Sequence, residues 1–131
     1  MMEKQLNFIT KRSSVGARCS AADVTITMGS DATHDKKRGF RRVVIHFRNM
    51  ASKRVAKSGY TVVAIDGDRL YFSNASETVG YKLFGSSQCD TRTIQILDKR
   101  LANWAETRVG NYYLEFDEEL NYWYIDFKNR Y

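Results

Sequence analysis

The stretch GYTVVAIDGDRLYF, residues 59–72, has the pattern of a β-hairpin. An apolar run from Val62 to Ile65 meets Asp66-Gly67, a dipeptide that favours the positive φ angles of a tight hairpin turn. Residues 69–72 then return as the partner strand. The stretch therefore predicts two antiparallel strands joined by a short turn.

Alternation of apolar and polar residues continues along the rest of the chain. Residues 24–28 and 42–48 alternate in this way, which is typical of strands with one buried face. Further strands are expected at 80–84, 91–97, 112–116 and 122–127. The chain is therefore predicted to be rich in β-structure.

Two segments, 49–59 and 98–106, depart from this alternation. Each begins with a residue suited to N-capping, Asn49 or Asp98, and a glycine lies at or shortly after the end of each. We expect two short helices that dock on the sheets, because isolated helices of this length are marginal in water.

The two halves of the chain show the same order of expected elements. The tripeptide MGS at 28–30 matches FGS at 84–86, and residues 59–66 match residues 110–117. An internal duplication explains this repeat, and chance similarity between β-rich segments is the alternative. The sequence predicts one compact domain over residues 1–131, of the β-rich α+β class. Two ββαββ-like halves, 22–73 and 78–128, are expected to form one small barrel or sandwich with two short helices.

Charge distinguishes the two halves. The 131 residues include 21 Lys and Arg against 15 Asp and Glu, for a net charge of +6. Residues 1–58 carry a net charge of +9 and residues 59–131 a net charge of −3. A basic excess of this size indicates an acidic partner, nucleic acid above all, whereas the alternative is a solvated surface that serves solubility. A hydrophobic content of 43% argues against a disordered chain.

Patterns of catalytic or metal-binding residues are weak. His34 lies near Asp31 and Asp35 without the spacing of a metal site, and Cys19 and Cys89 are 70 positions apart. The first residues, MMEKQLNFITKR, do not have the pattern expected of a signal peptide, and no apolar run is long enough to cross a bilayer. The sequence predicts a cytoplasmic, non-enzymatic protein with no cofactor, metal ion or membrane partner.

Residues 36–42 form the most basic segment, with five cations in seven residues between two expected strands. Lys and Arg neutralise phosphates and release counterions, and Phe40 among them is suited to stack on a base. Alternatively, Phe40 begins the buried face of the next strand while the cations stay solvated. Residues 1–20 are expected to be a partly flexible basic segment. The predicted nucleic-acid-binding residues are Lys36, Lys37, Arg38, Phe40, Arg41 and Arg42, supported by Arg48, Lys53 and Arg54.

Nine of the 17 aromatic residues lie between positions 104 and 131. Alternation predicts that Tyr113, Tyr122 and Tyr124 point away from the core, where tyrosine is typical of protein interfaces. Acidic residues between 115 and 119 would repel phosphate, so this hairpin is expected to contact a protein target or a second copy of the chain. The alternative is cross-strand aromatic pairing that stiffens the hairpin.

The run RVVI at 42–45, the short helix after it and the hairpin ending in Gly67-Asp68-Arg69-Leu70 resemble the swapped-hairpin fold of AbrB-type transition-state regulators. The related MraZ-type proteins place two such units in one chain, as the repeat here would. The resemblance implies a small β-barrel that binds DNA through basic residues on one face, usually as an oligomer.

These observations favour a small regulator that binds nucleic acid with little sequence specificity through residues 36–42. The alternative is a protein of a phage or mobile element that inhibits a host nuclease or nucleoprotein complex, as anti-CRISPR proteins do. That function would depend on the exposed tyrosines rather than on the basic segment.

Overall fold

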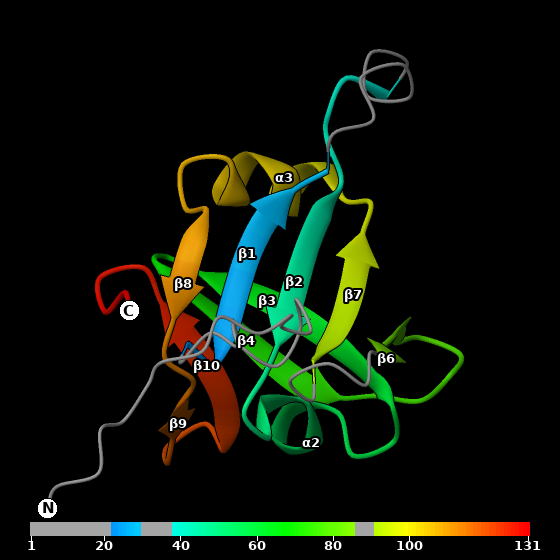
Figure 1. Cartoon of the computed structure of the whole chain (residues 1–131), viewed down its shortest axis with the longest axis vertical. Helices are drawn as coiled ribbons and strands as arrows, with labels where there is room; N and C mark the ends of the chain where they lie inside the picture. Colours follow the sequence, from blue (N-terminus) through cyan, green and yellow to red (C-terminus); the bar gives the residue numbers. More distant parts are fainter. Residues whose placement is uncertain (1–21, 30–37, 86–90) are drawn as a thin grey trace, which may run out of the picture.

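Two antiparallel sheets packed face to face make up the described part of the molecule (Figure 1). The computed structural model describes residues 22–29, 38–85 and 91–131. Sheet A has the strand order β6-β7-β2-β1-β8, and sheet B has the order β5-β3-β4-β10-β9. The predicted β-rich α+β class is confirmed, and because neither sheet closes on itself the fold is a sandwich rather than a barrel.

The elements of the two sheets come from both halves of the chain. Sheet A contains β1 (Val24–Met28), β2 (Val43–Phe47), β6 (Phe84–Gly85), β7 (Arg92–Ile96) and β8 (Gly110–Tyr112). Sheet B contains β3 (Tyr60–Asp66), β4 (Arg69–Asn74), β5 (Tyr81–Lys82), β9 (Glu115–Asp117) and β10 (Tyr122–Asp126). The described residues also form two helices, α2 (Ala51–Val55) and α3 (Lys99–Ala105), at opposite ends of the sandwich (Figure 1).

The hairpin predicted at 59–72 is present as β3 and β4. Asp66 pairs with Arg69, so Gly67 and Asp68 form a two-residue loop. Gly67 has a φ of 60°, which glycine adopts without the steric cost that a Cβ atom brings. The Asp-Gly signal therefore located the tight turn correctly.

Two predicted strands are broken in the structure. The strand expected at 112–116 is divided between β8 in sheet A and β9 in sheet B. The strand expected at 80–84 is likewise divided between β5 in sheet B and β6 in sheet A. Side-chain alternation does not reveal where a backbone changes its hydrogen-bonding partner, so both crossings were missed.

Both predicted helices are present, and they begin differently. The Asp98 carboxylate accepts a 2.9 Å hydrogen bond from the Leu101 N–H, as expected of an N-cap. The helix α2 instead follows Met50, whose φ is 74° and whose side chain makes no capping bond. The predicted N-cap residue Asn49 is therefore wrong, since its amide donates to the Ala22 carbonyl oxygen at 3.4 Å instead.

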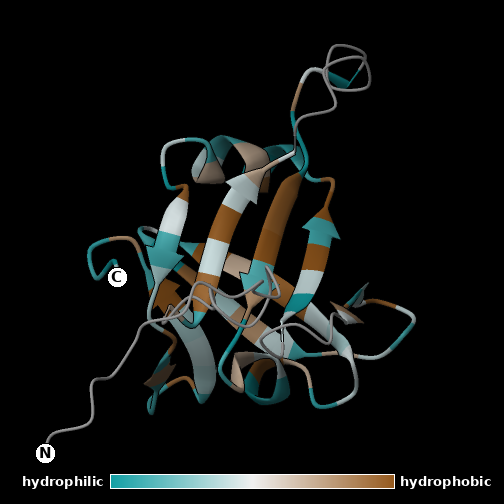
Figure 2. Ribbon diagram, viewed as in Figure 1, coloured by the Kyte–Doolittle hydropathy of each residue, from teal (hydrophilic) through white to brown (hydrophobic). Residues whose placement is uncertain are grey.

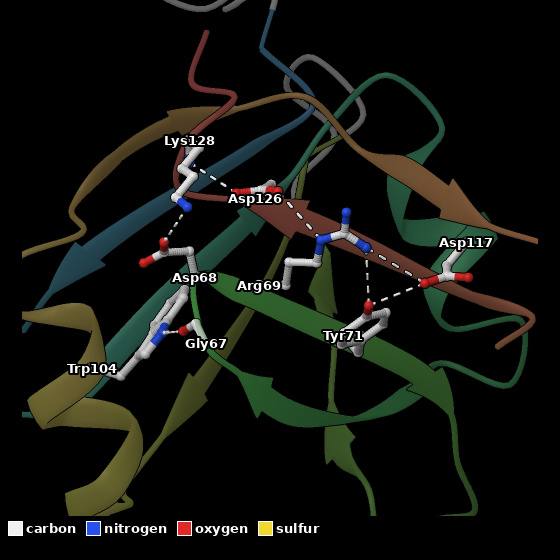
Figure 3. Close-up of polar contacts among 8 residues, drawn as sticks. All are labelled: Gly67, Asp68, Arg69, Tyr71, Trp104, Asp117, Asp126 and Lys128. Carbon is white, nitrogen blue, oxygen red and sulfur yellow. Dashed lines mark hydrogen bonds and ion pairs between the residues drawn. The ribbon is translucent and has the colours of Figure 1, made fainter. Parts of the chain in front are cut away.

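The inner faces of the two sheets form one core, and the alternating hydropathy behind it is visible as bands along β1 and β7 (Figure 2). Phe47 of sheet A meets Phe72 of sheet B edge to face, with ring centroids 5.2 Å apart and an interplanar angle of 81°. Trp104 of α3 donates its indole N–H to the Gly67 carbonyl oxygen at 2.8 Å (Figure 3). This bond ties α3 to the β3–β4 turn.

The strand pairing is symmetric about two pairs of residues. Ile45 lies opposite Ile94 where β2 pairs with β7, and Tyr71 lies opposite Tyr124 where β4 pairs with β10. In sheet A the next strands outward from this pair are β1 beside β2 and β6 beside β7. In sheet B they are β3 beside β4 and β9 beside β10. These strands are thus arranged symmetrically about the two pairs, and the internal duplication itself stays a prediction from the sequence.

The contact between Phe47 and Phe72 allows a test of the sandwich. Phe47→Ala removes a fully buried ring at the sheet–sheet interface, so we expect a loss of about 3–5 kcal/mol in the free energy of unfolding. Urea unfolding followed by circular dichroism measures this loss. Leu120→Ala, at a side chain that is 52% exposed, is the control and should change stability by less than about 0.5 kcal/mol. Similar effects of the two substitutions would contradict the described core.

Candidate nucleic-acid interface

The strand β2 lies at the centre of sheet A and defines its outer face. Val43, Ile45 and Phe47 are fully buried, so the alternate residues Val44 and His46 point outward. By the same alternation, Arg42 and Arg48, one residue beyond each end of β2, belong to the outer face. A six-residue separation along an extended chain places these two arginines about 20 Å apart.

A row of side chains crosses the outer face perpendicular to β2. The row is built by residues directly opposite one another in the sheet, Asn111 of β8, Thr25 of β1, His46 of β2, Thr93 of β7 and Phe84 of β6. Thr25 Oγ1 lies 2.7 Å from Asn111 Oδ1, and His46 Nδ1 lies 2.9 Å from Thr93 Oγ1. The row therefore offers hydrogen-bonding groups and one aromatic ring, and it contains no carboxylate.

Hydrogen bonds hold the two arginines over this face. Arg48 Nη1 donates to Thr25 Oγ1 at 2.5 Å, beside the polar row. Arg42 Nη1 donates to Gln95 Oε1 at 3.3 Å, toward the other end of β2. A ligand lying along β2 would meet a guanidinium near each end.

The aromatic ring on this face is Phe84, which the sequence analysis did not single out. Its side chain is 58% exposed, and Lys82 Nζ lies 5.8 Å from the ring centroid. Phe40 is instead partly buried against the core, with the Arg38 guanidinium 5.8 Å from its ring. The structure thus packs Phe40 partly against the core, ahead of the start of β2, and presents Phe84 to solvent.

The structure places the other predicted basic residues that it describes in surroundings different from those of Arg42 and Arg48. Lys36 and Lys37, like residues 1–20, lie outside the described residues. Arg41 donates from Nε to the Gly29 carbonyl oxygen at 2.7 Å, at the base of the β1–β2 connection. Lys53 and Arg54 lie on α2, and the Arg54 guanidinium stacks 5.0 Å from the Trp123 ring of sheet B.

Electrostatics at the centre of the row keep His46 neutral. Burial lowers the pKa of His46 below its usual range, and the neighbouring Arg48 guanidinium lowers it further. Burial also lowers the pKa of Arg48. At neutral pH, His46 therefore acts as a hydrogen-bonding group while Arg48 supplies the charge.

The outer face of sheet B has a different chemistry (Figure 3). Arg69 bridges Asp126 at 3.3 Å and Asp117 at 3.5 Å, and the Tyr71 hydroxyl donates to Asp117 at 3.1 Å. Hydrogen bonds from the backbone N–H of Leu120 and from Tyr71 lower the pKa of Asp117. The charge of Arg69 is thus neutralised by carboxylates of the protein itself.

The three tyrosines predicted to form an interface do not share one surface. Tyr124 stacks on Tyr71 with centroids 5.4 Å apart and lies beneath the Arg69 guanidinium, so it makes the cross-strand pair considered as the alternative. Tyr122, on the same strand, is exposed. Tyr113 follows β8 of sheet A and packs on Tyr131 instead.

Comparison with protein-family models, with curated proteins and with solved structures finds no match for this chain. The resemblance to AbrB-type regulators therefore stays a prediction from the sequence. Within the described ranges, no helix is long and apolar enough to span a membrane.

His46 makes the free energy of unfolding of the protein depend on pH. Its lowered pKa means that the folded state binds fewer protons than the unfolded state once the pH falls below the unfolded value of about 6.5. We therefore expect the free energy of unfolding to decrease between pH 7.5 and pH 5.5, and we expect His46→Gln to reduce that decrease. Urea unfolding at both pH values measures the difference. The other histidine, His34, is present in both proteins and cancels. An unchanged pH dependence in His46→Gln would rule out this role.

Proposed function

We propose that the outer face of sheet A binds single-stranded nucleic acid and that the protein acts as a small non-enzymatic regulator. The observation that carries this proposal is Phe84, exposed at the end of an uncharged polar row with Arg48 beside it. Aromatic rings on the open face of a sheet stack on unpaired bases, and polar side chains beside them bond to the base edges.

The distribution of charge supports an anionic ligand on this face. Among the described outward positions of β1, β2, β7 and β8, none is Asp or Glu. Sheet B, by contrast, presents Asp66, Glu115, Asp117 and Asp126 on its outer face, with Arg69 paired to two of them. A polyanion is therefore attracted to sheet A and repelled by sheet B.

Each group in the interface has a distinct part in binding. Phe84 stacks on one base, while Thr25, Thr93 and the neutral His46 ring exchange hydrogen bonds with base edges or sugars. Arg42 and Arg48 neutralise phosphates near the two ends of β2, and because these contacts are made to the backbone they favour binding with little sequence specificity.

Stacking on Phe84 is tested by fluorescence anisotropy with fluorescein-labelled 12-mers of oligo(dT) and oligo(U) and with a duplex of the same length. We expect the single strands to bind more tightly than the duplex, and Phe84→Ala to weaken single-strand binding at least about fivefold, because one stacked base contributes about 1–3 kcal/mol. Leu120→Ala is the matched control, because Leu120 is similarly exposed but lies on the sheet B side. Tighter binding of the duplex, or equal behaviour of the two variants, would overturn the assignment.

The phosphate contacts are tested by the salt dependence of the same binding. Replacing both Arg42 and Arg48 with Gln removes two cations, so the slope of log K against log salt should become shallower by about 1.4 for a single strand. Lys128→Gln removes an exposed cation that lies near Asp68, away from sheet A, and should leave the slope almost unchanged. An unchanged slope in the double variant would show that phosphates are bound elsewhere.

A further inference from the structure

The strand β3 has an edge that is only partly covered. On one side β4 pairs with it from Thr61 to Asp66. On the other side β5 pairs only with Tyr60 and Thr61. Among the residues that the structure describes, no strand pairs with this second edge beyond Thr61, so the edge of residues 62–66 is open.

The direction of the backbone groups at this edge follows from the register. The Tyr60 carbonyl oxygen accepts a 3.0 Å hydrogen bond from the Ala75 N–H, on the β4 side of the strand. In an antiparallel pair, alternate residues bond to the same neighbour. Val63 and Ile65 therefore direct their N–H and C=O groups toward the open edge.

A groove runs beside this edge. Its volume is about 480 Å³, and residues 62–65 form one wall. Ile96 of β7 and Leu101 of α3 contribute to its apolar lining, together with Val79. An open strand edge and a helix thus flank one hollow, which is the geometry in which a domain accepts an added strand.

Charge in the groove comes from two residues near the start of α3. Asp98 lines the groove, but its carboxylate is already used to cap the helix. Arg100 also lines it and is exposed, and in the described ranges it makes no ion pair with a carboxylate. The capping carboxylate keeps its charge, so the groove has no net charge, and Arg100 is the group in it that is left to pair with a carboxylate.

We propose that this groove binds an extended, acidic peptide segment of a partner protein, which adds to sheet B beside β3. Its backbone bonds to Val63 and Ile65, alternate apolar side chains enter the hollow next to Ile96 and Leu101, and an Asp or Glu side chain faces Arg100. The open edge of five residues matches a peptide strand of about 16 Å.

A second copy of the chain fits this edge less well than a peptide does. Antiparallel pairing of two β3 strands through Val63 and Ile65 would place Gly67 of one copy opposite Thr61 of the other. That edge position is occupied by Tyr81 of β5. A short peptide lacks the β3–β4 turn that contains Gly67, and it can end or bend away before it reaches β5.

The experiment is selection from a phage-displayed random heptapeptide library on the full chain, with Val63→Pro as the counter-target. Proline removes the N–H that faces the open edge and is tolerated at such positions, and urea unfolding verifies that the variant is folded. We expect enriched sequences to alternate apolar residues and to contain Asp or Glu. A synthetic copy of an enriched peptide should bind Val63→Pro at least tenfold more weakly. Its N-methylated form, which lacks backbone donors, should lose binding to the unaltered protein, and this second measurement does not depend on the variant.

A charge exchange tests the role of Arg100. Arg100→Glu should weaken binding of the acidic peptide and strengthen binding of its Lys-substituted copy. Lys99→Glu, on the same helix but not lining the groove, should do neither.

Three outcomes would overturn the proposal. The first is that no peptide is enriched. The second is that Val63→Pro binds the enriched peptide as tightly as the unaltered protein does and that the unaltered protein binds the N-methylated peptide as tightly as the unmethylated one. The third is that light scattering shows a dimer and that Val63→Pro dissociates it, because the edge would then bind a second copy of the chain. Phe84→Ala should leave peptide binding intact, so this proposal and the proposed nucleic-acid function fail independently.

Discussion

The structure depends on the burial of two sheet faces against each other. The inner face of each sheet is covered by the inner face of the other. The contact of Phe47 with Phe72 lies where the two faces meet. Apolar burial stabilises a small domain only when the two surfaces are close-packed. That requirement fixes which side of every long strand points inward, and so it also fixes which residues are left on the two outer faces.

The two outer faces differ in charge although the strand pairing is symmetric. Ile45 with Ile94 and Tyr71 with Tyr124 lie at corresponding places in the two sheets. Around the first pair the outward residues are Val44 and polar or basic side chains, and around the second they include carboxylates that neutralise Arg69. The difference of charge between the two halves of the sequence thus becomes, in part, a difference between two surfaces. One surface suits an anionic ligand, and the other satisfies its own charges.

The two sheet crossings explain why one edge remains open. On one side of the sandwich, β8 pairs with β1 and β9 pairs with β10. On the other side, β5 pairs with the first two residues of β3 before the chain crosses to β6 and pairs with β7. Since β5 is short and β3 is long, the crossing covers only the beginning of β3. Residues 62–65 of the edge beyond it are apolar and include no lysine or proline, two residues by which proteins usually protect edge strands, and Asp66 is the one charged residue of the edge.

The sequence by itself determined the local structure. The Asp-Gly turn, the alternation along β1, β2 and β7, and the Asp98 cap are each specified by residues close together in the chain, and the structure contains all three. Tertiary structure alone decided the rest. The exposure of Phe84, the burial of Phe40 and the separation of Arg42 from Arg54 depend on which strand lies beside each residue. A periodicity of two predicts which face of a sheet a side chain occupies. It does not predict the neighbours across the sheet or the point where the backbone leaves one sheet for the other.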